Sequence, residues 1–154
     1  MLLGFDDLDA FKGIEMKLLA FERVLDYHED WRNRLVLVQI TNPPRSNSKE
    51  TQELAQFIRT TAERINSKYG DARTGFTPLI YEERPVPQHD RLALFALAHC
   101  VVVTATRDGM NLVPYEYIVC RQATPGLKER TSMLVVSGAP PRRLNDNTRD
   151  RDHT

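Results

Sequence analysis

Apolar residues along the chain form short continuous runs that alternate with stripes spaced three and four residues apart. Continuous runs predict strands buried on both faces, as in the middle of a parallel sheet. These runs fall at 1–4, 35–40, 78–81, 100–104 and 132–136. Stripes predict amphipathic helices, and the third one is apolar enough to predict a largely buried helix. The stripes fall at about 12–28, 54–65, 92–98 and 112–122.

This alternation of strands and helices predicts an α/β fold, a Rossmann-like parallel sheet with helices on both faces. In a sheet of order 3-2-1-4-5, a ligand binds where the order reverses, at the carboxyl ends of strands 1 and 4. The predicted domain spans 1–137. Residues 138–154 are rich in proline and charge and almost without apolar side chains, so we expect a disordered tail.

Charge and hydropathy exclude two classes of partner. Lys and Arg total 21, and Asp and Glu total 21, so the basic excess typical of nucleic-acid and membrane-surface binding is absent. No apolar stretch reaches the roughly 18 residues that cross a bilayer, and no signal peptide is recognisable. We expect a cytoplasmic protein without a cofactor or metal, since no histidine pair has ligand spacing. Cys100 and Cys120 are expected to be buried thiols.

The loop after the fourth predicted strand, 105–112, is one candidate for binding chemistry. Gly109 is expected to take a backbone shape closed to other residues. The helix that follows offers free N–H groups to an anion. The amides expected to reach a phosphate or sugar belong to Met110, Asn111 and Leu112. Asp108 can accept a hydrogen bond from a sugar hydroxyl, and Glu116 can accept hydrogen bonds from ribose hydroxyls. The alternative is a capped turn with Glu116 on a solvated face.

The loop after the first predicted strand, 5–13, is the second candidate. Lys12 stands at the predicted start of a helix, where a cation opposes the helix dipole unless an anion lies between them. The alternative is a surface lysine. The pair Asp7 and Asp9 is also typical of haloacid-dehalogenase-type phosphatases and of receiver domains. Both interpretations lack partners, because only Asp108 follows strand 4 and no clear Asp or Lys ends strands 3 and 5.

Four segments resemble trehalose-6-phosphate synthases, a family of retaining glycosyltransferases with two Rossmann lobes. They are FKGI at 11–14, VLVQI at 36–40, RINSKYG at 64–70 and, above all, RDGMNLVPYEY at 107–117. Family members transfer glucose from UDP-glucose to glucose 6-phosphate. The resemblance covers about 1–137 and implies the donor-binding, carboxyl-terminal lobe of a GT-B-type enzyme, without its acceptor lobe. The plant form of the last motif is the most similar.

The resemblance also implies roles for individual residues. Lys12 would contact the donor diphosphate, Asp108 the donor glucose and Glu116 the ribose hydroxyls. The backbone of Gly109, Met110, Asn111 and Leu112 would cradle glucose and phosphate. Arg45 stands where the family has an arginine for the acceptor phosphate, with a weaker local match. No residue is assigned as catalytic.

Three departures from the family change the expected activity, and one of them is the missing acceptor lobe. Asp7 replaces the arginine of active members, as in a plant subgroup with regulatory roles. A carboxylate about 5 Å from a phosphate charge is repelled by about 3 kcal/mol at an effective dielectric of about 20. After 137 the likeness ends, as after a frame shift or alternative splice. The truncated sheet should expose apolar surface, which predicts marginal stability, a protein partner or self-association.

Three hypotheses therefore stand. The first is a UDP-glucose-binding lobe that is weak or inactive alone. The second is a non-catalytic regulatory or interaction module that has lost sugar-nucleotide binding. The third is the product of a non-functional gene fragment.

Overall fold

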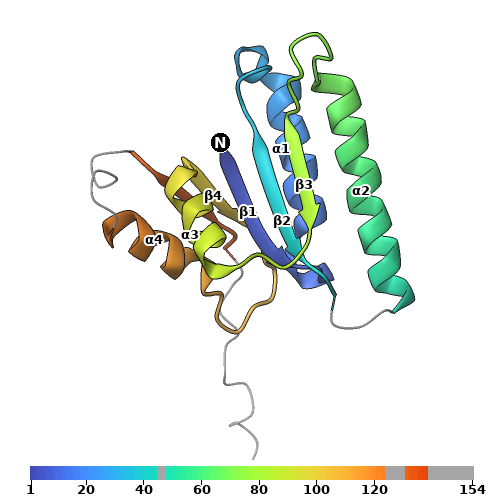
Figure 1. Ribbon diagram of the computed structural model, residues 1–154. Coiled ribbons are helices and arrows are strands. Elements are labelled where there is room, and N and C mark those ends of the chain that lie inside the picture. The colour runs from blue at the N-terminus through green and yellow to red at the C-terminus, as the bar shows by residue number, and fades with distance from the viewer. Residues whose placement is uncertain (45–47, 124–130, 139–154) are drawn as a thin grey trace, which may run out of the picture.

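One parallel sheet of five strands organises the chain (Figure 1). A computed structural model describes residues 1–44, 48–123 and 131–138. The strand order is β3-β2-β1-β4-β5, so the predicted order and its reversal between β1 and β4 are confirmed. The strands are β1 (Leu2–Asp7), β2 (Leu37–Asn42), β3 (Leu79–Glu83), β4 (Cys100–Val103) and β5 (Met133–Val136).

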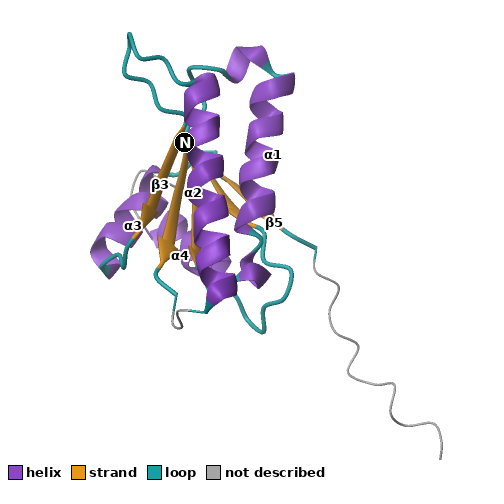
Figure 2. Cartoon of the chain, turned by 90° about the vertical axis from the view of Figure 1, so that its right-hand side faces the viewer, coloured by secondary structure: helices purple, strands orange, loops and turns teal. Residues whose placement is uncertain are grey.

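Helices cover both faces of this sheet, as predicted (Figures 1 and 2). Two long helices, α1 and α2, lie side by side on one face, and α3 and α4 pack together on the other. The helices are α1 (Ile14–Tyr27), α2 (Lys49–Tyr69), α3 (Gln88–Leu97) and α4 (Val113–Ala123), with short 3-10 helices η1 (Ala10–Lys12) and η2 (Glu29–Trp31).

Each face of the sheet has its own apolar core. Leu18 of α1, Leu37 of β2 and Ile58 of α2 are buried in the first core. The second core joins alternate β1 residues to α3 and α4, and its aromatic contacts place Phe95 between Phe5 and Tyr117. Cys100 and Cys120 are buried thiols, as predicted.

A buried ion pair lies between β1, β2 and α1. The Lys17 ammonium donates to Asp6 Oδ2 at 2.5 Å and to Gln39 Oε1 at 3.0 Å, and the Lys17 and Asp6 side chains are 2% and 1% exposed. Gly4 leaves room for this cluster, because a Cβ there would lie 2.0 Å from Gln39 Oε1. The prediction that the first strand ends at Gly4 is therefore wrong. Charge pairing lets the strand continue through Asp7.

Two further predictions of local structure are wrong. The first long helix begins at Ile14 rather than Lys12, because Lys12 belongs to η1 and Gly13 interrupts the helical backbone with φ 65°. The third helix is not largely buried: Phe95 is its buried residue, and Leu92 and Leu97 are exposed. An apolar stripe reports one helix face, and much of α3 faces away from the sheet.

The edge strand β5 exposes apolar side chains, as the sequence predicted. Met133, Val135 and Val136 are all exposed. Association through this edge stays a prediction. The predicted tail at 138–154 lies outside the described residues, apart from Gly138.

Candidate functional site

The two loops singled out in the sequence meet at the carboxyl ends of β1 and β4. The amide of Thr106 donates to the carbonyl of Phe11 at 2.7 Å, and the Thr106 hydroxyl donates to the same carbonyl at 3.2 Å. The Thr104 hydroxyl lies 3.0 Å from the carbonyl oxygens of both Lys12 and Gly13. These hydrogen bonds join the two loops, whose residues are more than 90 positions apart in the chain.

Gly13 permits this close approach. Its φ is 65°, and a Cβ on it would lie 2.4 Å from the Thr104 carbonyl oxygen. Glycine at this position is required for both backbone conformation and space. The corresponding expectation for Gly109 is wrong: its φ is not positive, and a Cβ there would meet no atom within 4 Å.

Lys12 and Asp108 form an ion pair across the two loops. Lys12 Nζ lies 2.6 Å from Asp108 Oδ2, and the side chains are 19% and 24% exposed. Lys12 is in the last turn of η1, which Asp9 caps by accepting from the Phe11 amide at 2.7 Å. Lys12 also directly precedes Gly13, the N-cap of α1, so the expected conflict with that helix dipole is present, and the Asp108 carboxylate offsets it. An ammonium has about three donors, and Asp108 uses one.

The segment before α4 exposes backbone amides beside this pair. Asn111 Oδ1 accepts from the amide of Val113 at 3.0 Å, so the helix begins at Val113 rather than Leu112. Met110 and Leu112 are exposed. Within the described ranges, no hydrogen-bond acceptor is found for the amides of Met110, Asn111 and Leu112. Free amides next to an ammonium form an arrangement that accepts an anion.

Glu116 lies in the first turn of α4 and is ion-paired with Arg91 of α3. The Arg91 guanidinium stacks over Phe5 at 4.5 Å and over Phe95 at 5.6 Å from the ring centroids. Glu116 is thus paired with a neighbouring helix, and 39% of its side chain is exposed. The sequence analysis missed Arg91, because it took from this helix only the apolar stripe.

Asp7 ends β1 at the same edge of the sheet, and its side chain turns toward β2. Asp7 Oδ1 accepts from the Asn42 side-chain amide at 2.8 Å, in register with the Asp7–Asn42 strand pair. Arg45, the predicted acceptor-phosphate residue, lies outside the described residues.

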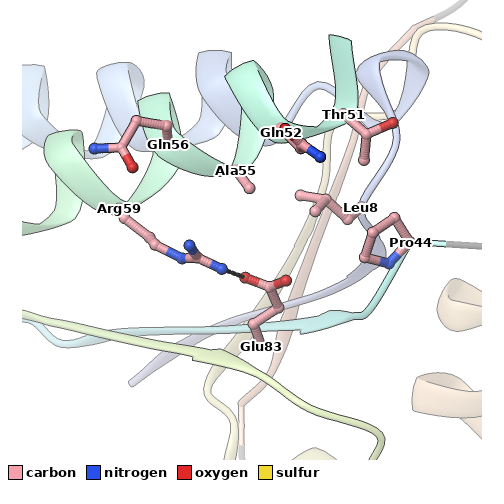
Figure 3. Close-up of a pocket in the computed structure, with 8 residues that line it drawn as sticks. All are labelled: Leu8, Pro44, Thr51, Gln52, Ala55, Gln56, Arg59 and Glu83. Carbon is pink, nitrogen blue, oxygen red and sulfur yellow. Dashed lines mark hydrogen bonds and ion pairs between the residues drawn. The ribbon is translucent and has the colours of Figure 1, made fainter. Parts of the chain in front are cut away.

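A hollow of about 330 Å³ lies between the carboxyl ends of β1–β3 and the first half of α2 (Figure 3). Leu8 and Pro44 form one wall, and Arg59 pairs with Glu83 at 2.5 Å across it. The predicted donor residues do not line this hollow.

Neither a cluster of metal ligands nor a membrane-spanning helix is found among the described residues. No group of three or more His, Cys, Asp or Glu side chains there could hold a metal ion. None of the helices there is long and apolar enough to cross a membrane.

The strand order defines a Rossmann-type α/β domain in which the loops after β1 and β4 meet at one edge of the sheet. The chain belongs to glycosyltransferase family 20, whose model matches residues 1–140. A relative, "Probable alpha,alpha-trehalose-phosphate synthase [UDP-forming] 9" of Arabidopsis thaliana, is 48% identical over 146 residues. That match covers 89% of this chain and 17% of the relative, so the chain spans about a sixth of the relative's length.

Solved structures of the same family share the fold. An alpha,alpha-trehalose-phosphate synthase (UDP-forming) from Burkholderia xenovorans, in complex with glucose-6-phosphate, matches with a TM-score of 0.80 and 32% identity. The match covers 90% of this chain and 29% of that one. A trehalose-6-phosphate structure from E. coli bound with UDP-2-fluoro glucose matches with a TM-score of 0.79 and 28% identity, over 88% of this chain and 28% of that one. The fold is that of a lobe of a GT-B trehalose-phosphate synthase.

Proposed function

We propose that this chain is the UDP-glucose-binding lobe of a trehalose-phosphate-synthase-like protein, and that it binds the nucleotide sugar weakly and transfers no glucose alone. The observation that carries the proposal is the contact between Lys12 and Asp108, 96 residues apart, beside amides before α4 that have no acceptor among the described residues. The E. coli relative bound with UDP-2-fluoro glucose supports the ligand class.

Each residue then has a role that its geometry permits. The Lys12 ammonium binds the diphosphate with the donors that Asp108 leaves free. The amides of the segment from Gly109 to Leu112 bind phosphate and glucose oxygens, and Asp108 accepts from a glucose hydroxyl. Glu116 accepts from the ribose hydroxyls. We also propose that Arg45 contacts the acceptor phosphate. The cytoplasmic location expected from the sequence is part of the same proposal.

Asp7 is the reason for proposing weak binding. Its carboxylate lies at the strand end from which the diphosphate would be reached, and it is exposed. Repulsion of about 3 kcal/mol at about 5 Å exceeds the ~0.3–1 kcal/mol that a helix dipole supplies. Glucosyl transfer to glucose 6-phosphate belongs to the longer relatives, of which this chain spans about a sixth.

Calorimetric titration of the folded 154-residue chain with UDP and UDP-glucose tests the proposal. We expect dissociation constants in the millimolar range and at least tenfold weaker UDP binding in Lys12→Met. Lys49→Met is the matched control, because Lys49 is exposed on α2 and its partner among the described residues is Glu53. A folded wild-type chain that gives no binding heat at millimolar ligand would refute the proposal.

A second candidate function is a regulatory or interaction module without sugar-nucleotide binding. Asp7 and the exposed apolar edge of β5 favour it. Asp7→Arg separates the two candidates. If charge alone limits the site, we expect this variant to bind UDP at least tenfold more tightly than the wild type. An affinity unchanged from the wild type would reject the charge argument.

A further inference from the structure

The pair formed by Arg91 and Glu116 joins α3 to α4. Arg91 Nη2 donates to Glu116 Oε2. The Arg91 side chain is 26% exposed and that of Glu116 is 39% exposed. Arg91 therefore binds one oxygen of the Glu116 carboxylate, and part of the Glu116 side chain is exposed to solvent.

The guanidinium has little freedom of its own. It stacks at 4.5 Å over Phe5 of β1 and at 5.6 Å over Phe95 of α3. Its Nε is buried and lacks a hydrogen-bond partner in the described part of the chain. A planar, stacked guanidinium loses less entropy per hydrogen bond than a flexible ammonium, so Arg91 is suited to orienting a neighbouring carboxylate.

We propose that Arg91 is a positioning residue that orients Glu116 to accept from the ribose hydroxyls of a bound nucleotide. This inference rests on the proposed function. A carboxylate has about four lone-pair sites. Arg91 takes one site on Oε2, which leaves the other site there and all of Oε1 for a vicinal diol. Among the described residues, no second partner engages the Glu116 carboxylate.

Two nucleotides separate positioning from a general structural role. UDP carries the ribose hydroxyls, and 2′,3′-dideoxy-UDP lacks them while keeping the base and diphosphate. A residue that acts through Glu116 should affect UDP alone. A residue that binds the diphosphate, or that holds the fold together, should affect both ligands equally.

The experiment measures the affinity of both nucleotides for wild type, Arg91→Met, Glu116→Gln and the double variant. Hydrogen bonds to a charged group predict that wild type prefers UDP by about 10- to 100-fold. Arg91→Met should weaken UDP by about 3- to 10-fold and dideoxy-UDP by about twofold at most. The double variant should bind UDP about as well as Glu116→Gln alone, because Arg91 then has no carboxylate to orient.

Two further variants act as controls. Arg91→Lys keeps the charge without the stacked fork, so its UDP preference should lie between those of wild type and Arg91→Met. It also serves if Arg91→Met does not fold, as judged by circular dichroism. Arg84→Met removes an arginine from a surface pair with Glu82 at 2.6 Å and should change neither affinity.

The outcomes distinguish this inference from the proposed function. If Arg91→Met and Arg91→Lys weaken UDP and dideoxy-UDP equally, or leave the preference for UDP unchanged, the positioning role is overturned and the nucleotide site stands. If the folded wild type binds neither nucleotide, the proposed function is overturned and the inference with it.

Discussion

Gly13→Ala tests whether the close approach of the two loops forms the crevice. Residue 13 has φ 65°, and a Cβ on it would lie 2.4 Å from the Thr104 carbonyl oxygen. A non-glycine residue in the left-handed region costs roughly 1–2 kcal/mol. Forcing an added carbon into a packed site costs typically about 1–3 kcal/mol. We therefore expect Gly13→Ala to lower the free energy of unfolding by about 2–5 kcal/mol.

Two other glycines separate these costs. Gly75 has φ 70° and open space around its Cβ position, so Gly75→Ala should cost only the conformational ~1–2 kcal/mol. Gly109 has open space and no positive φ. Gly109→Ala should be neutral or stabilising by up to about 1 kcal/mol, because alanine lowers the entropy of the unfolded chain.

Urea unfolding measures all three variants. With a slope of about 1–3 kcal/mol/M for a small protein, the Gly13→Ala midpoint should fall by about 1 M or more. Moving the loop away from Thr104 should also displace Lys12 and weaken UDP binding in the Gly13→Ala protein that remains folded. A Gly13→Ala midpoint equal to that of Gly75→Ala would refute the close-approach argument.

Three other perturbations follow from the described contacts. Lys17→Met leaves the buried Asp6 carboxylate unpaired and should cost about 3–5 kcal/mol of unfolding free energy; a cost under about 1 kcal/mol, measured in urea, would contradict this. Burial raises the pKa of the Cys100 thiol, so Cys100 should react with a disulfide reagent at pH 8 only in denaturant. Labelling of Cys100 in the native protein would contradict its burial. A hydrogen bond from Lys68, then one from Tyr69, lowers the pKa of Asp26. Its stabilisation is present above the unfolded pKa of about 4 and is lost as pH falls through the lower folded pKa. Asp26→Asn should therefore lose less stability than wild type on acidification, and equal loss would argue against the pairing.

The candidate donor-site residues could be predicted from the sequence because two independent signals indicated the same loop. Strand order placed the loops after β1 and β4 at one crevice, and the RDGMNLVPYEY motif lies in the second of those loops. The model of glycosyltransferase family 20 confirms the family over residues 1–140. The roles of Lys12, Asp108 and Glu116 in donor binding stay predictions.

Hydrophobic periodicity by itself determined which segments are strands and helices and their order along the chain. Periodicity is sufficient here because side chains point to the core with a period of about 3.6 residues in a helix and 2 in a strand, so burial leaves a local pattern of apolar residues. Tertiary structure alone decided which polar groups pair. Lys17 with Asp6, Arg91 with Glu116 and Lys12 with Asp108 come from different elements, and no local pattern encodes their distances. It also decided that Gly13, rather than Gly109, needs to be glycine, because the clash that requires it comes from Thr104, just after β4 and about 90 residues further along the chain.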